Sequence, residues 1–273
     1  MKTKTYLFLP VVLLISVSNA LSQEIITTTS VLSTVVKEIV KDRFRVETLT
    51  PSGSCPGHFD IKGSHLASIE KNGIIFAHGF EPYIQQIKDT VKNPAFSTVI
   101  VRTEGSWFVL DNQKKIYNEV KTAISEKFPK YRDFFEANYR KAITETENTD
   151  RRIKDMVKEK KLIGISVICN NHISEMLEYI GFKVVATYGR KEELTPFDIK
   201  KLIEAGKKER ISIVIDNLEA GPDTGKIIAD ELKIAHTTIS NFPEGYPDTS
   251  TLRDTLYKNT EKIIKIYEKN KVR

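Results

Sequence analysis

The sequence is poor in the residues that most often carry chemistry. Its 273 residues include two cysteines, five histidines and one tryptophan. It has no G-x-x-x-x-G-K-[ST] loop, G-x-G-x-x-G turn, G-x-S-x-G turn or H-E-x-x-H helix, which excludes the common nucleotide-binding, hydrolase and zinc-protease motifs. A thiol-dependent exported enzyme using Cys55 or Cys169 stays open, because a nucleophilic Cys–His pair need not be adjacent in sequence.

The chain also lacks a concentrated basic segment. It carries 42 Lys and Arg against 36 Asp and Glu, a formal net charge of +6, and the two signs are interspersed. No run of basic residues with interleaved aromatics is present, so we predict no nucleic-acid partner.

The N-terminus has an apolar run too short to span a membrane. Lys2 and Lys4 precede an apolar stretch from Tyr6 to Val17, and Ser18-Asn19-Ala20 follows. This order is typical of a signal peptide, here residues 1–20, whereas a spanning helix needs about 20 apolar residues. An uncleaved anchor is the alternative, and no cysteine lies near the cleavage site to carry a lipid. The predicted location is therefore periplasmic or otherwise extracytoplasmic, where cysteines can form disulfides.

The rest of the chain alternates strand-like and helix-like segments in two blocks. Strands are predicted at 24–30, 46–51, 73–79 and 97–103, and again at 162–169, 182–188, 211–216 and 235–240. Alternation of this kind indicates an α/β fold with mainly parallel sheets. We therefore predict two lobes, 21–110 and 162–273, each a small sheet with flanking helices.

The stretch between the lobes, 111–161, has almost no strand signal. Pro129 divides it, and one narrow stripe follows, formed by Tyr131, Phe135, Tyr139, Ala142, Ile153 and Val157 and continued by Thr146 and Thr149. A helix of about thirty residues would be about 45 Å long, more than the width of a small lobe. We predict a long backbone helix that links the lobes.

Residues that bind metals follow the predicted strands. Cys55 and His58 come after the second strand, His78 after the third, and Cys169 and His172 after the first strand of the second lobe. Ligands bind beyond the carboxyl ends of parallel strands, so these five side chains are the predicted metal site. Thiolate and imidazole suit zinc better than manganese or calcium. The alternative is a Cys55–Cys169 disulfide, and His65 and His236 are interpreted as structural or exposed.

This layout resembles the solute-binding proteins of metal-uptake ABC transporters, of the zinc/manganese type. The local resemblance lies in GHFDIKGSHLASIEKNGIIFAHGFE (57–81) and YIGFKVVATY (179–188). The resemblance implies four ligands, of which His58 matches the first. The second ligand of the family is a histidine that precedes a tryptophan, and here Trp107 is present without that histidine. At the third position, a histidine or glutamate in the family, this chain has Asn170, with Cys169 and His172 nearby. At the fourth, an aspartate in the family, it has Ser240-Asn241.

The resemblance implies a function as well as a fold. It implies a monomeric binding protein, not an enzyme, that captures a divalent transition metal, zinc-like, as cargo between its lobes. Its partner would be the membrane permease of an ABC transporter. A second interpretation keeps the fold but makes the cargo a metal chelate such as a siderophore, haem or corrinoid.

Overall fold

The computed structural model describes residues 24–271. The predicted signal peptide and its cleavage site near Ala20 lie outside the described residues. Within 24–271, no helix is both long enough and apolar enough to cross a membrane.

The eight strands within residues 24–271 form two separate four-stranded parallel sheets, as predicted. The first sheet has the order β2-β1-β3-β4 and the second the order β6-β5-β7-β8. The first contains β1 (Glu24–Thr27), β2 (Arg45–Thr48), β3 (Ile74–Ala77) and β4 (Ser97–Ile100). The second contains β5 (Ser166–Asn170), β6 (Lys183–Tyr188), β7 (Ile213–Asn217) and β8 (Ala235–Ile239). The predicted fold class is therefore confirmed.

Helices connect the strands within each half. The first half contains α1 (Ser30–Val40), α2 (Gly63–Lys71) and α3 (Ile84–Thr90). The second contains α6 (Ser174–Tyr179), α7 (Pro196–Glu209), α8 (Lys226–Leu232) and α9 (Leu252–Lys271). Short 3₁₀ turns occur at Lys41–Arg43, Pro56–His58, Pro129–Tyr131, Asn171–Ile173 and Lys191–Glu193. Helix α7 begins at a capping box, in which Thr195 accepts from the Asp198 amide and Asp198 from the Thr195 amide.

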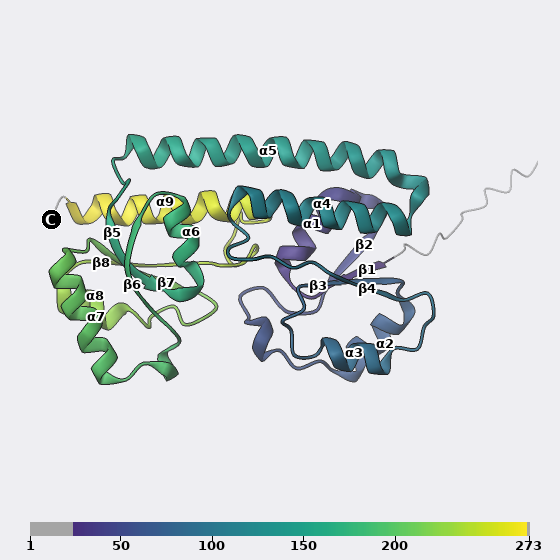
Figure 1. Ribbon diagram of the computed structural model, residues 1–273, viewed down its shortest axis with the longest axis horizontal. Coiled ribbons are helices and arrows are strands. Elements are labelled where there is room, and N and C mark those ends of the chain that lie inside the picture. Colours follow the sequence, from purple (N-terminus) through teal and green to yellow (C-terminus); the bar gives the residue numbers. More distant parts are fainter. Residues whose placement is uncertain (1–23, 272–273) are drawn as a thin grey trace, which may run out of the picture.

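Two long helices join the halves. They are α4 (Leu110–Lys127) and α5 (Arg132–Glu159), and the Pro129–Tyr131 turn divides them where the sequence predicted a break. Helix α5 has 28 residues and runs across both halves, above α4, α1 and α9 (Figure 1). Five members of the predicted stripe form its buried face, Phe135, Ala142, Thr146, Ile153 and Val157. Tyr139 and Thr149 are half-buried, and Tyr131 lies in the turn before α5.

One hydrophobic core runs through both halves beneath this helical layer. It includes Val35 of α1, Tyr117 of α4, Phe135 of α5, Met176 of α6 and Leu256 of α9. Smaller clusters lie against the other face of each sheet. Because the main core is shared, the division into 21–110, 111–161 and 162–273 as separate units stays a prediction.

Candidate metal-cargo site

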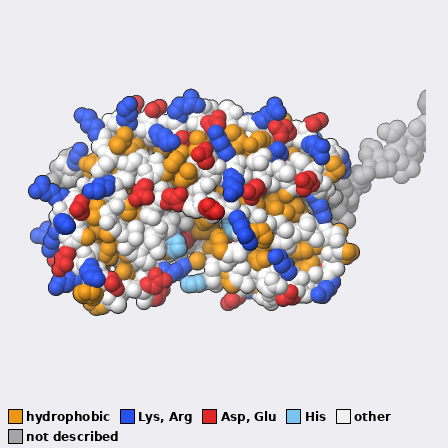
Figure 2. Space-filling view, in the orientation of Figure 1, with side chains coloured by type: hydrophobic (Ala, Val, Ile, Leu, Met, Phe, Trp, Pro, Cys, Tyr) orange, Lys and Arg blue, Asp and Glu red, His pale blue; other side chains and the backbone are white. Residues whose placement is uncertain are grey.

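A cavity lies where the two halves meet at the carboxyl ends of their strands. Its volume is about 340 Å³. The first half contributes Cys55, Phe80 and Trp107 to its lining, and the second half contributes His172, Arg190 and Glu219. Figure 2 shows the surface hollowed between the halves, with histidine side chains beside the hollow. This is the position at which open parallel sheets bind ligands.

The turn after β2 directs two potential metal ligands toward the second half. The 3₁₀ turn Pro56–His58 is closed by a bond from the His58 amide to the Cys55 carbonyl, 3.1 Å. Both side chains meet Arg190, whose Nη2 donates to Cys55 Sγ at 2.9 Å and whose Nη1 lies 3.5 Å from His58 Nδ1. His58 is exposed and Cys55 half-buried. Of the predicted pair, Cys55 lines the cavity, whereas His58 is not a lining residue and shares only the contact with Arg190.

Arg190 is a cavity residue that the sequence analysis did not identify. It lies two residues after β6 ends at Tyr188, and its amide donates to Glu193 Oε2 at 3.0 Å. Its place after the carboxyl end of a parallel strand is where ligands bind, but arginine is not a metal ligand and was therefore not among the predicted site residues. Its guanidinium carries a permanent positive charge into the cleft.

The second half supplies His172 and Glu219. The His172 amide donates to the Asn170 side chain at 3.0 Å, which fixes the turn that follows β5. Burial, and next the charge of Arg190, lower the pKa of His172. Glu219 accepts from the Asn241 amide at 2.9 Å and from the Ser240 hydroxyl, while burial raises the pKa of its carboxyl.

His78 does not line the cavity, contrary to the prediction. It is 5% exposed, its Nε2 lies 2.9 Å from Thr29 Oγ1, and its ring stacks on Phe80 and Trp107. Burial lowers its pKa, so the neutral ring is favoured. His78 supports the aromatic wall of the cavity from behind.

Cys169 is also misplaced by the prediction. Its side chain is fully buried in the core beneath the helical layer, beside Ile173 and Met176, and burial raises the pKa of its thiol. The physical reason is strand alternation, since Val167 and Cys169 face the helical layer while Ile168 faces the other side. Cys55 and Cys169 are both free, so the alternative of a disulfide is wrong.

The remaining histidines have structural partners, as interpreted from the sequence. His65 Nδ1 accepts from the Lys62 amide at 3.1 Å, at the start of α2. His236 Nε2 lies 2.6 Å from Oδ2 of the buried Asp216, which also accepts from the Tyr188 hydroxyl. Within residues 24–271, no three His, Cys, Asp or Glu side chains are grouped closely enough to hold a metal ion. The assignment of Cys55, His58 and His172 as ligands stays a prediction.

Trp107 joins the two halves at the cavity. Its Nε1 donates to the Asn241 carbonyl at 2.7 Å, and its ring lies 5.0 Å from that of Phe242. It is the only tryptophan of the chain. Its indole is therefore a direct spectroscopic reporter of events in the cavity.

Comparison with known proteins agrees with this architecture. A family model described as zinc-uptake complex component A, periplasmic (ZnuA), matches residues 25–266. The metal ABC transporter substrate-binding lipoprotein FimA of Streptococcus parasanguinis is 23% identical over an alignment of 243 residues that covers 77% of each chain. The manganese ABC transporter substrate-binding lipoprotein PsaA of Streptococcus mitis is 21% identical over an alignment of 244 residues that covers 75% of this chain and 77% of the relative.

Solved structures share the fold at lower identity. The Cd-bound periplasmic metal binding protein of candidatus Liberibacter asiaticus superposes with a TM-score of 0.76 at 17% identity, covering 90% of this chain and 100% of that one. A crystal structure of ZnuA has a TM-score of 0.77 at 17% identity, covering 90% and 99%.

Proposed function

Because this chain belongs to the ZnuA family of substrate-binding proteins of metal ABC transporters, we propose that it captures a zinc-like divalent metal as cargo in the cavity between its halves. The observation that carries the proposal is that Cys55 and His172 line the cavity from the two halves, while His58 meets the same guanidinium, that of Arg190, as Cys55 does. Thiolate and imidazole are ligands that zinc binds well and manganese poorly.

The relatives differ in the metal for which they are named, so the metal of this chain is inferred from its own cavity residues. The PsaA relative is named for manganese and the matching family model for zinc. Manganese prefers carboxylate and water oxygens, and Glu219 is the carboxylate that lines this cavity together with a cysteine and a histidine. The chemistry of the lining therefore favours zinc.

The proposal includes export and delivery. The N-terminal pattern of Lys2, Lys4 and the apolar run supports export, and the protein would pass its metal to a membrane permease as a monomer without catalysing a reaction. The curated relatives are named as lipoproteins, whereas this sequence has no cysteine near Ala20.

Elemental analysis of protein purified without added metal tests the proposal. We expect zinc at about one equivalent, and calorimetric titration of the stripped protein should show tighter binding of zinc than of manganese. Protein that carries no transition metal and binds neither ion would refute the proposal.

A further inference from the structure

The cavity is larger than a single coordinated ion requires. Its volume of about 340 Å³ falls within the range of about 300–1,000 Å³ that is typical of small-molecule sites. Three aromatic rings line it, those of Phe80, Trp107 and Phe242, and the Phe80 ring is 55% exposed. Flat apolar walls of this kind contact an organic ligand, whereas they supply no lone-pair donor that could coordinate a metal ion.

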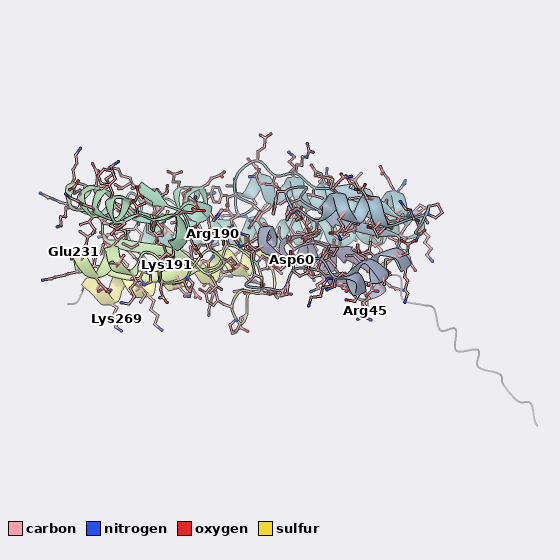
Figure 3. The ribbon with its side chains drawn as sticks, turned by 90° about the horizontal axis from the view of Figure 1, so that it is seen from below. Arg45, Asp60, Arg190, Lys191, Glu231 and Lys269 are labelled. Atoms are coloured by element: carbon pink, nitrogen blue, oxygen red, sulfur yellow. The ribbon has the colours of Figure 1, made fainter. Side chains whose placement is uncertain are left out.

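The charge in the cavity also suits an anion. The guanidinium of Arg190 stands among the potential metal ligands, 2.9 Å from Cys55 Sγ and 3.5 Å from His58 Nδ1. Among the residues that the structure describes, no carboxylate forms an ion pair with it. A guanidinium fork repels a dication but matches a carboxylate in a two-point hydrogen bond. Figure 3 shows Arg190 at the middle of the molecule, at the boundary between the halves.

The protein also supplies too few ligands for a closed site. A captured zinc ion needs about four donors, yet no three potential ligands are grouped within residues 24–271. A co-ligand that arrives with the metal would supply the missing donors and fill the space beside the aromatic rings.

We propose that the cavity captures the metal together with a small carboxylate-bearing chelator. Cys55, His58 or His172 bind the metal, a free carboxylate of the chelator pairs with Arg190, and its body packs on Trp107 and Phe242. The inference rests on the proposed function and names the form in which the metal is captured.

Fluorescence titration of Trp107 tests this inference with zinc chloride, with zinc mixed with citrate, oxalate or L-histidine, and with each chelator alone. A site for the bare ion binds zinc less tightly when a chelator competes for it. A site for the complex binds zinc more tightly when the chelator is present, and we expect at least a tenfold gain in apparent affinity with one of the three chelators.

Two charge-matched variants locate the effect. Arg190→Gln should abolish the gain while its melting temperature stays within a few degrees of the unchanged protein, because the half-buried side chain lies outside the core. Arg45→Gln removes the same charge from an exposed side chain at the start of β2, far from Arg190 (Figure 3), and should keep the full gain.

The outcomes are distinct. Weaker zinc binding with all three chelators, a chelator that binds equally well without zinc, or an undiminished gain in Arg190→Gln would each overturn the inference. In the first case zinc still binds alone and the proposed function survives. If zinc binds in no form, the proposed function itself fails.

Discussion

Arg253 of α9 and Glu38 of α1 form a largely buried ion pair that ties the two halves together. Arg253 Nη2 lies 2.7 Å from Glu38 Oε1 and 2.8 Å from Glu145 Oε2 of α5. The Tyr117 hydroxyl of α4 donates to the same Glu38 carboxylate. Four helices from both halves thus share one charge network, in addition to the common hydrophobic core.

Breaking this network should destabilise the whole fold. In Arg253→Met the Glu38 carboxylate, only 10% exposed, would lose its cation, and removing one partner of a buried pair costs about 3–5 kcal/mol. Urea unfolding measures the loss. Arg140→Met is the control, because Arg140 is 77% exposed in its pair with Glu136 and such pairs contribute at most about 1 kcal/mol. Equal losses in both variants would contradict the assignment.

The two cysteines should differ sharply in reactivity. Cys55 is half-buried at the cavity and near a guanidinium, whereas Cys169 is fully buried, and burial raises the pKa of its thiol. We expect iodoacetamide to alkylate Cys55 alone in the native protein and both cysteines in denaturant, as peptide mass spectrometry would show. Added zinc should protect Cys55. Labelling of Cys169 at the native rate of Cys55 would place it outside the core.

His78 should make stability depend on pH. Burial lowers its pKa below the ordinary value of 6.5. As the pH falls below that value, His78 is therefore protonated in the unfolded chain while it is still neutral in the folded chain. Its contribution to stability is present above about pH 6.5 and is lost as the pH falls below it, by up to about 1.4 kcal/mol per pH unit. Urea unfolding at pH 5 and pH 7.5 should show this loss in the unchanged protein and a smaller one in His78→Gln. A slope that is identical in both proteins would exclude His78 as its source.

Strand alternation explains which parts of the site could be predicted. Sequence periodicity predicted both sheets and the long helix, because parallel strands and amphipathic helices have clear apolar patterns. The strand 162–169 is apolar on both faces, so the pattern could not tell which face carries Cys169. Arg190 was missed for a different reason, since its role depends on Cys55, 135 residues away in sequence, and only the fold brings the two together.

His58 is the residue on which the metal assignment most depends, because both its place after β2 and the family resemblance select it. A ligand that binds only the folded protein stabilises it by about 4 kcal/mol at a thousandfold excess over Kd, which raises the melting temperature by about 8–16 °C. In His58→Ala we expect this zinc-induced rise to disappear, while the melting temperature without zinc changes by only a few degrees, because the exposed His58 ring lies outside the hydrophobic core. His172→Ala should have the same effect from the other wall.

The matched control for His58→Ala is His65→Ala, a histidine seven positions along the same segment whose Nδ1 accepts from the Lys62 amide. His65→Ala should keep the full zinc-induced rise in melting temperature, because the His65 ring is hydrogen-bonded to the backbone at the start of α2. Differential scanning fluorimetry with and without zinc compares the three variants directly. A full zinc-induced rise in the melting temperature of His58→Ala would show that Cys55 and His58 are not the first-half ligands of the metal site. If the zinc-induced rise in melting temperature disappeared in His65→Ala, the first-half metal ligand would lie at α2 instead. Both substitutions remove an imidazole, and they differ only in its position.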